Sequence, residues 1–248
     1  VQMDGSHHDW FEGRGPKCVL MGYIDDATNR VHARFYDYEG TFPAMDSFKR
    51  YILKYGIPQS VYLDKHTTYK SPQRLSIEDE LNNTRTLSQM ERVFKQLAVD
   101  VIHADSPQAK GRVERGFGTH QDRLVKELRL SNINTVKQAN KFLGCYYTQK
   151  HNRKFTYPAN NKTNLYRPIP KHLDLNRIFS IKNKASLRND FTIRHNNTYY
   201  QILEAIRADT ITLEERLNGK QYLYHKDKQL KYKLIDKRFE KPKQLLKL

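Results

Sequence analysis

Cysteine is scarce in this chain, which has 248 residues and only two cysteines, Cys18 and Cys145. Neither has a second cysteine or a histidine at metal-ligand spacing, so neither a disulfide framework nor a cysteine-based metal site is indicated. No apolar run approaches the ~20 residues that span a bilayer, and no signal peptide opens the chain. We therefore expect a cytoplasmic location. Because Val1 begins almost directly on a strand, we also expect a fragment of a longer protein.

Acidic residues are also few, with 27 Asp and Glu against 44 Lys and Arg, so the formal net charge is +17. Residues 1–150 hold 22 basic and 18 acidic residues, a net +4, whereas residues 151–248 hold 22 and 9, a net +13. Such a surplus favours a polyanionic partner, although it can also be a merely solvated surface. The split is typical of a catalytic unit joined to a part that holds nucleic acid.

Three of the few acidic residues follow features that could bring them together. Asp4 closes the short apolar stretch 1–3, Asp64 closes the stretch 61–63, and Glu114 lies in a long basic helix. If the two strands run parallel, both aspartates lie at one edge of a sheet, and a helix packed there brings the glutamate. Three carboxylates amid positive charge predict a site for a hard divalent cation that works on phosphate.

The first 150 residues alternate between strand and helix patterns. After a strand that ends at Asp4, strands are expected at Cys18–Ile24, 31–38, Ser60–Asp64 and Asp100–Ala104. Helices are expected at 43–55, 87–97 and 136–147, and a further one begins at Ser106-Pro107. A three-stranded meander extended by parallel strands gives an α/β fold with a mixed five-stranded sheet and flanking helices. Asp25 and Asp26 are assigned to a turn.

The helix that begins at Ser106 carries a core-facing stripe, with Glu114 at the edge between that stripe and solvent. The stripe consists of Val113, Phe117, His120, Leu124 and Leu128. Gly111 and Gly118 weaken an ordinary helix. Both lie on the side of Glu114, where missing side chains let another molecule approach closely.

The second half of the chain reads differently. Residues 151–172 are rich in Asn, Lys and Pro and predict a linker. Residues 173–236 predict a small all-β barrel, because short strands recur about every ten residues. We also expect this barrel to bind DNA, because most of the basic surplus lies in this half of the chain. These strands are expected at 191–195, 198–203, Thr210–Arg216, Gln221–His225 and 230–235, with hairpin turns at Asn196-Asn197 and Asn218-Gly219. Residues 237–248 form a basic tail.

Four segments resemble the integrase core of DDE transposases and retroviral-type integrases, and are most similar to bacterial insertion-sequence transposases of the ISNCY group. They are residues 2–16 (QMDGSHHDWFEGRGP), 23–28 (YIDDAT), 62–66 (YLDKH) and 106–115 (SPQAKGRVER). The last is the most specific. The resemblance covers residues 1 to about 160, and the β part resembles the C-terminal barrel of such transposases only in kind.

The resemblance implies an RNase H-like fold in which Asp4, Asp64 and Glu114 are the catalytic carboxylates. It implies two Mg²⁺ ions, with Mn²⁺ as a substitute, that act in 3′-end cleavage and strand transfer of an insertion sequence. It also implies DNA partners (element ends and target), a homodimer or higher oligomer, and association with the bacterial nucleoid. Three departures stand out: a long stretch before Glu114, His66 where many integrases carry Gly, and no N-terminal helix-turn-helix.

Several residues near the carboxylates are candidates for other roles. Lys110, Arg112 and Arg115 on the helix, and Lys65 and His66 after Asp64, are candidate DNA contacts, although a solvated helix face would look the same. Asp9 is the rival of Asp4 as the first ligand. His7 and His8 could touch metal or phosphate, but loop histidines are more often simple polar contacts.

Two other functions stay open at this stage. A hydrolytic RNase H-fold nuclease would share the carboxylates but would not need a basic second part to hold another DNA. A non-catalytic DNA-binding remnant would need no carboxylates at all. Joined DNA ends in a Mg²⁺-dependent assay would separate the first alternative from a transposase.

Overall fold

A computed structural model describes residues 1–64, 88–104 and 111–236. The chain divides into two compact units, Val1–Phe179 and Ser180–Leu248. In the described part, no helix is long and apolar enough to cross a membrane. The tail 237–248 and the expected helix start at Ser106-Pro107 lie outside the described residues.

The first unit is built on a five-stranded sheet in the order β3-β2-β1-β4-β5. The strands are β1 (Gln2–His8), β2 (Cys18–Ile24), β3 (Val31–Tyr36), β4 (Ser60–Asp64) and β5 (Asp100–Ala104). β1, β2 and β3 pair antiparallel, whereas β4 runs parallel to both β1 and β5. This mixed sheet with flanking helices is RNase H-like and confirms the expected fold class.

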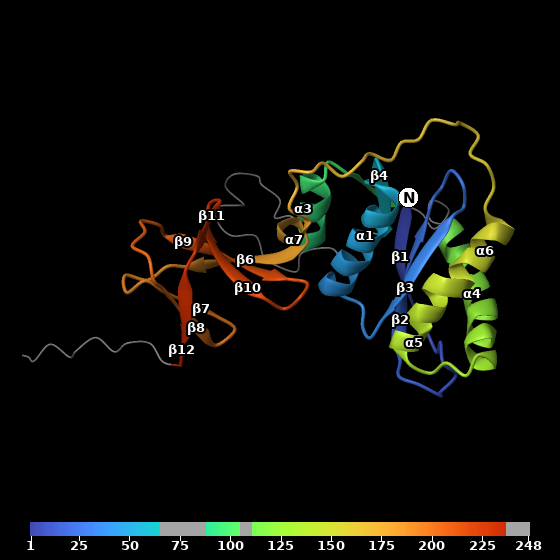
Figure 1. Cartoon of the computed structure of the whole chain (residues 1–248), viewed down its shortest axis with the longest axis horizontal. Coiled ribbons are helices and arrows are strands. Elements are labelled where there is room, and N and C mark those ends of the chain that lie inside the picture. The colour runs from blue at the N-terminus through green and yellow to red at the C-terminus, as the bar shows by residue number, and fades with distance from the viewer. Residues whose placement is uncertain (65–87, 105–110, 237–248) are drawn as a thin grey trace, which may run out of the picture. The chain divides into compact units, whose positions relative to one another are not determined.

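Helices cover both faces of this sheet (Figure 1). One face carries α1 (Thr41–Tyr55) and α3 (Gln89–Gln96), and the other carries α4 (Gly111–Leu130), α5 (Val136–Phe142), the π-helical turn η2 (Leu143–Tyr147) and α6 (Thr148–Phe155). Ser88 caps α3, since its hydroxyl accepts the Glu91 N–H and the Glu91 carboxylate accepts the Ser88 N–H. The helix expected at 136–147 corresponds to α5 and η2, and it continues without a break into α6.

Strand β2 is the centre of the core, and all seven of its residues are buried because helices cover both of its sides. On one side Tyr23 stacks on Tyr51 with ring centroids 4.8 Å apart, and its hydroxyl lies 2.7 Å from the Ser47 hydroxyl. On the other side Phe117 of α4 packs over Gly22, where a Cβ atom would lie 2.8 Å from the ring. Glycine at this position is what lets α4 lie close to the sheet.

The edge strand β3 is covered by two asparagines from the helices beside it. Asn140 of α5 accepts the Phe35 N–H at 2.8 Å and donates to the Phe35 carbonyl at 2.9 Å. Asn152 of α6 makes the same pair of bonds with Val31, both at 2.8 Å. An edge strand presents unpaired backbone groups, and these side chains satisfy four of them.

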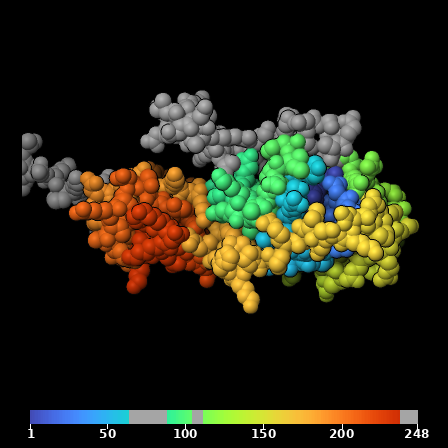
Figure 2. Space-filling view, turned by 90° about the horizontal axis from the view of Figure 1, so that it is seen from above, coloured from blue at the N-terminus to red at the C-terminus, as the bar shows by residue number. Residues whose placement is uncertain are grey.

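The segment that was expected to be a linker, 151–172, begins inside α6 and then runs along the first unit. Arg167 pairs with Ile57 in an isolated β-bridge, and its guanidinium donates to the carbonyls of Leu97 and Ala98. In Figure 2 this segment, yellow to orange, passes in front of blue and cyan residues of the same unit. The short helix α7 (Leu175–Ile178), capped by Asp174, follows it.

The described residues of the second unit, 180–236, are all-β as expected, and they form seven strands rather than five. A four-stranded sheet has the order β11-β10-β9-β6, and a three-stranded sheet the order β12-β8-β7. The strands are β6 (Ser180–Ser186), β7 (Thr192–His195), β8 (Thr198–Ile202), β9 (Thr210–Arg216), β10 (Gln221–His225), β11 (Lys228–Leu230) and β12 (Tyr232–Ile235). Strand β6 was not expected, and the single strand expected at 230–235 is divided between the two sheets. Closure into a barrel stays a prediction.

Candidate functional site

The parallel pairing of β1 with β4 sets the level of the two aspartates. Gln2 is the register partner of Tyr62, and Asp4 and Asp64 each lie two residues further along their strands. Asp64 is in turn the register partner of Ala104 in β5. The expectation that Asp4 ends its strand was wrong, because β1 continues to His8 through pairs with β2. If this register continues for two residues, it brings the two aspartates level on adjacent strands.

Helix α4 runs along β1 and touches it on both sides of Asp4. Near the start of the helix, the Gln2 side-chain oxygen accepts the Val113 N–H at 3.0 Å. Two turns later the Gln121 amide donates to the Ser6 hydroxyl at 3.1 Å. Residues two apart share a face of a strand, so the half-buried Asp4 lies on the face of β1 that α4 covers.

Glu114 lies on the flank of α4 that passes Asp4. It directly follows Val113 and is seven residues, or about two turns, before Gln121, so both project from one flank. Glu114 is exposed, whereas Val113 and Phe117 beside it are buried. All members of the predicted core stripe of this helix are buried. A helix side chain leans toward the N-terminus of its helix. We therefore expect Glu114 to lean toward the level of Gln2, whose side chain meets Val113.

The three carboxylates as a metal-binding set stay a prediction. Among residues 1–64, 88–104 and 111–236, no cluster of three or more His, Cys, Asp or Glu has an arrangement that could hold a metal ion. Asp4 accepts the Gly5 N–H at 3.0 Å. The donor chemistry of the set itself, three carboxylates on adjacent elements, suits Mg²⁺, which prefers oxygen ligands.

The rival residues are engaged elsewhere. The Asp9 carboxylate accepts the Gly13 N–H at 3.1 Å in the turn after β1. His7 lies 2.6 Å from the Glu39 carboxylate, and the His8 ring packs edge-on against Trp10. Asp25 and Asp26 lie in the β2–β3 turn, as predicted, and the Asp25 carbonyl accepts the Asn29 N–H at 2.7 Å.

The predicted DNA contacts differ in how they lie. Lys65, His66 and Lys110 fall outside the described residues. Arg115 is exposed beside Glu114. Arg112 instead binds within the protein, since it donates to the Asp26 carbonyl and, at 2.7 Å, to the Tyr157 hydroxyl. A DNA contact is therefore better supported for Arg115 than for Arg112, and both stay predictions.

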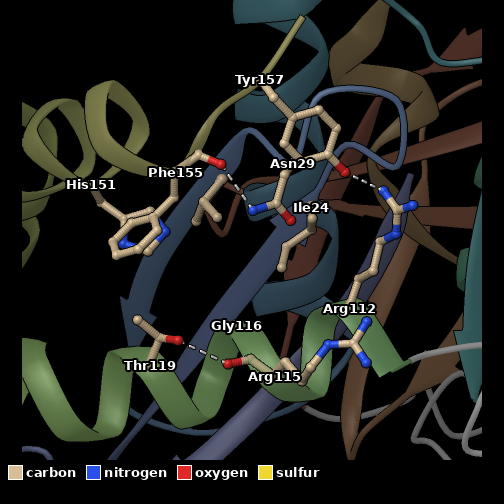
Figure 3. A pocket seen from close by; sticks show the side chains of 10 residues that line it. Ile24, Asn29, Arg112, Arg115, Gly116, Thr119, His151, Phe155 and Tyr157 are labelled. Carbon is tan, nitrogen blue, oxygen red and sulfur yellow. Dashed lines mark hydrogen bonds between the residues drawn. The ribbon is translucent and has the colours of Figure 1, made fainter. Parts of the chain in front are cut away.

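A cavity of about 290 Å³ lies on the flank of α4 that carries Arg112, Arg115 and Thr119 (Figure 3). Its walls come from α4, α6 and the β2–β3 turn, and Arg112 and Tyr157 meet at its rim. One further bond ties two of these elements together, since Asn29 in the β2–β3 turn donates to the Phe155 carbonyl at 3.1 Å. Thr119 donates to the Arg115 carbonyl within α4 at 3.1 Å.

Sequence reasoning missed two residues that shape this region, Gln2 and Asp26. The Gln2 side chain bonds Val113 through its oxygen and Asp26 through its nitrogen, at 3.0 and 2.9 Å. The signal that could have found Gln2 is its spacing, since a polar residue two positions before Asp4 lies on the same face of the strand.

The chain is similar in sequence to two curated proteins. The chain is 36% identical over 170 residues to a putative transposase, y4bF, of Sinorhizobium fredii, which covers 68% of this chain and 36% of that protein. It is 31% identical over 258 residues to the transposase for insertion sequence IS1202 of Streptococcus pneumoniae, which covers 97% of this chain and 53% of that protein. The chain is similar to transposases. It spans about a third of the first relative and about half of the second.

A solved structure of the HTLV-2 integrase catalytic core domain in complex with magnesium has 18% sequence identity and a TM-score of 0.40, covering 56% of this chain and 78% of that chain. No model of a known protein family matches the chain. The RNase H-like assignment rests on the sheet topology given above.

Proposed function

We propose that this chain is the catalytic part of a DNA transposase that cleaves the 3′ ends of an insertion sequence and joins them to target DNA. The observation that supports the proposal most is the parallel pairing of β1 with β4, the strands of Asp4 and Asp64, together with the contact of the Glu114 helix α4 with β1 through Val113 and Gln2. The similarity to transposases supports it.

Asp4, Asp64 and Glu114 would hold two Mg²⁺ ions in this proposal, with Mn²⁺ as a substitute. When bound, such ions activate the attacking oxygen and stabilise the leaving oxygen of an in-line displacement. Asp4 belongs to the middle element of the three, because β1 contacts both β4 and α4. Asp4 would therefore supply the ligand between those from Asp64 and Glu114.

The reaction has two displacements at phosphorus. In the first, a water oxygen attacks, the bond between phosphorus and the 3′ oxygen breaks, and the element end is left with a free 3′-OH. In the second, that hydroxyl attacks a target phosphodiester, a new bond to phosphorus forms, and a target 3′ oxygen leaves. Neither step needs a covalent bond to the protein.

Arg115 is proposed to contact the DNA backbone next to the reacting phosphodiester. It follows Glu114 directly and is exposed, and a guanidinium suits phosphate oxygens. The basic residues of the second unit are proposed to hold further DNA, and two element ends imply at least a dimer. These predictions go beyond the similarity itself, because the chain spans only about a third and a half of the two transposases that it matches.

The experiment is a cleavage and joining assay with a duplex that carries the terminal repeat of the element encoding this protein. We expect Asp4→Asn, Asp64→Asn and Glu114→Gln each to lower both rates at least ~10³-fold, because each removes one ligand charge at constant size. DNA affinity, measured by fluorescence anisotropy, should stay within about threefold, since phosphate contacts dominate affinity.

Asp122→Asn is the matched control, because it removes a carboxylate from the same helix at a position where Asp122 pairs with Lys126 in solvent. It should leave both rates near wild type. Cleavage without joined product would favour a hydrolytic nuclease. Unchanged joining by Asp64→Asn would refute the carboxylate assignment.

A further inference from the structure

We infer that Gln2 and Asp26 are positioning residues. They fasten residues 112 and 113 of α4 to β1 and so fix where Glu114 points. This inference rests on the proposed function for its consequence, but not for its geometry. Neither residue belongs to the predicted carboxylate set. Both bind the helix beside Glu114 rather than the DNA or the reacting atoms.

The first step concerns the contact between Gln2 and α4. The Val113 N–H of α4 donates to the Gln2 side-chain oxygen at 3.0 Å. Gln2 is 4% exposed, so this bond is shielded from water.

The second step concerns the orientation of the Gln2 amide. Its nitrogen donates to the Asp26 carboxylate at 2.9 Å. An ionised carboxylate can only accept and a backbone N–H can only donate, so the amide fits between them in a single orientation. Asp26 therefore decides that the oxygen of Gln2, and not its nitrogen, faces α4.

The third step is a second tie from Asp26 to the same turn. Arg112 donates to the Asp26 carbonyl, and its Nε lies 3.5 Å from the Asp26 carboxylate. Arg112 also donates to Tyr157, as Figure 3 shows. Asp26 thus holds two consecutive residues of α4, Arg112 directly and Val113 through Gln2. Glu114 is the next residue along the chain.

The consequence for the reaction follows from these ties. Glu114 directly follows Val113 and its side chain is exposed, so its position depends on how residues 112 and 113 of α4 are held. A displacement of about 1 Å in a catalytic group can cost ~10²-fold in rate. The strand that carries Asp4 also carries the residue that anchors the helix of Glu114, so one element sets the distance between the two carboxylates.

The test is an exchange of charge across the Gln2–Asp26 bond. Gln2→Glu sets a carboxylate against the carboxylate of Asp26, so we expect kcat for 3′ cleavage to fall about 10²-fold with KM for DNA within about threefold. Asp26→Asn keeps an acceptor for Gln2 and should lose less than about tenfold. The double variant restores a donor and acceptor pair and the original net charge, and should recover to within about fivefold of wild type.

Hydrogen exchange of the α4 amides gives a readout that does not depend on activity. The Val113 amide should exchange faster in Gln2→Glu and return toward the wild-type rate in the double variant. Gln121→Met is the matched control, because it removes the Gln121–Ser6 tie between the same two elements two turns from Glu114. It should leave kcat within about twofold and the exchange at Val113 unchanged.

Asp26→Ala covers the case in which Gln2→Glu does not fold, since Asp26 is partly exposed. It removes the acceptor of the Gln2 amide and the carboxylate near Arg112. It should show the same fall in kcat. Faster exchange at Val113 with unchanged kcat would overturn the positioning role, as would unchanged exchange. An inactive wild type would refute the proposed function, and the exchange data would still decide whether the anchor exists.

Discussion

His120 of α4 and His151 of α6 pack against each other, with ring centroids 4.6 Å apart. The Tyr147 hydroxyl lies 3.0 Å from Nδ1 of His120. Burial and, to a smaller extent, the neighbouring His151 lower the pKa of His120 to about 3. Burial likewise lowers the pKa of His151 to about 4, with Arg123 adding to the effect. Both imidazoles are therefore neutral in the folded protein at pH 7.

This pair predicts a loss of stability in mild acid. In the unfolded chain an imidazole takes up a proton below about pH 6.5, whereas the folded protein resists protonation until about pH 4 or lower. The unfolded state binds more protons in this window, so stability falls as the pH drops from 6.5 toward 4. Between pH 6.5 and 5, each histidine contributes a loss of about 2 kcal/mol at most.

Urea unfolding of wild type and His120→Gln at pH 7 and pH 5 checks this expectation. The variant should lose less stability on acidification, because its amide cannot be protonated. His8→Gln, at an exposed histidine of β1, is the control and should behave like wild type. An equal acid loss in His120→Gln and wild type would show that these rings are not responsible.

At the level of single residues, the sequence correctly predicted that Asp64 is the last residue given for β4, but it wrongly predicted that Asp4 ends β1. Apolar residues followed by Asp marked both, and β4 does end at Asp64. β1 continues past Asp4 because the polar residues Ser6 to His8 pair with the fully buried β2, which is a tertiary effect. The spacing of Gln2 could place it on the face of Asp4, but its two partners are distant in the chain and could not be predicted.

Gly22 is the contact point between two elements, β2 and α4, and it gives a sharp test of their packing. In Gly22→Ala the new Cβ would lie 2.8 Å from the buried Phe117 ring, so the helix must move. We expect a loss of about 1–3 kcal/mol in unfolding free energy and slower cleavage, because Glu114 is one turn from Phe117. Chemical denaturation and the cleavage assay measure both.

Gly118→Ala is the matched substitution on the same helix. In the described part of the chain nothing lies within 4 Å of the Cβ it would add, so the change should stabilise α4 by about 0.5–1 kcal/mol through helix propensity. If both alanines destabilised the protein equally, close packing at Gly22 would not be the cause.

Among the elements, those with strong periodicity were predicted closely. β2, β4, β5, β9 and β10 have the expected bounds. β6 was missed because Ile181 and Ala185 are its only apolar residues, and pairing with β9 across seven residue pairs makes it a strand. Residues 151–155, the second part of α6, were assigned to the linker 151–172 because the sequence there is polar. α6 is nevertheless a helix, and it buries His151 on its inner side.

The charge of the whole molecule is concentrated in its second part, and one face of the second unit combines cations with an aromatic ring. Arg194 and Arg188 lie 5.7 and 5.8 Å from the ring centroid of Tyr199. In the register of β12 and β8, Lys233 pairs with Gln201, which shares the face of Tyr199. We expect this face, opposite the core residues Tyr200 and Ile202, to contact the DNA backbone.

Salt dependence tests this expectation. Replacing Arg194 and Lys233 together by alanine should reduce the slope of log affinity against log salt concentration by about 2, for any DNA sequence. Lys137→Ala with Lys141→Ala removes the same charge from exposed positions of α5 and is the control. A slope lowered equally by the control would indicate a general charge effect rather than a contact face.

The asparagines on β3 have a consequence for how copies of this molecule can meet. Asn140 and Asn152 already occupy the outward backbone groups of Phe35 and Val31. A strand from a neighbouring copy cannot form a regular ladder there without displacing them. Higher-order assembly on DNA would have to proceed through side chains, loops or helices on that border, and never by extending the β-structure from one subunit into the next.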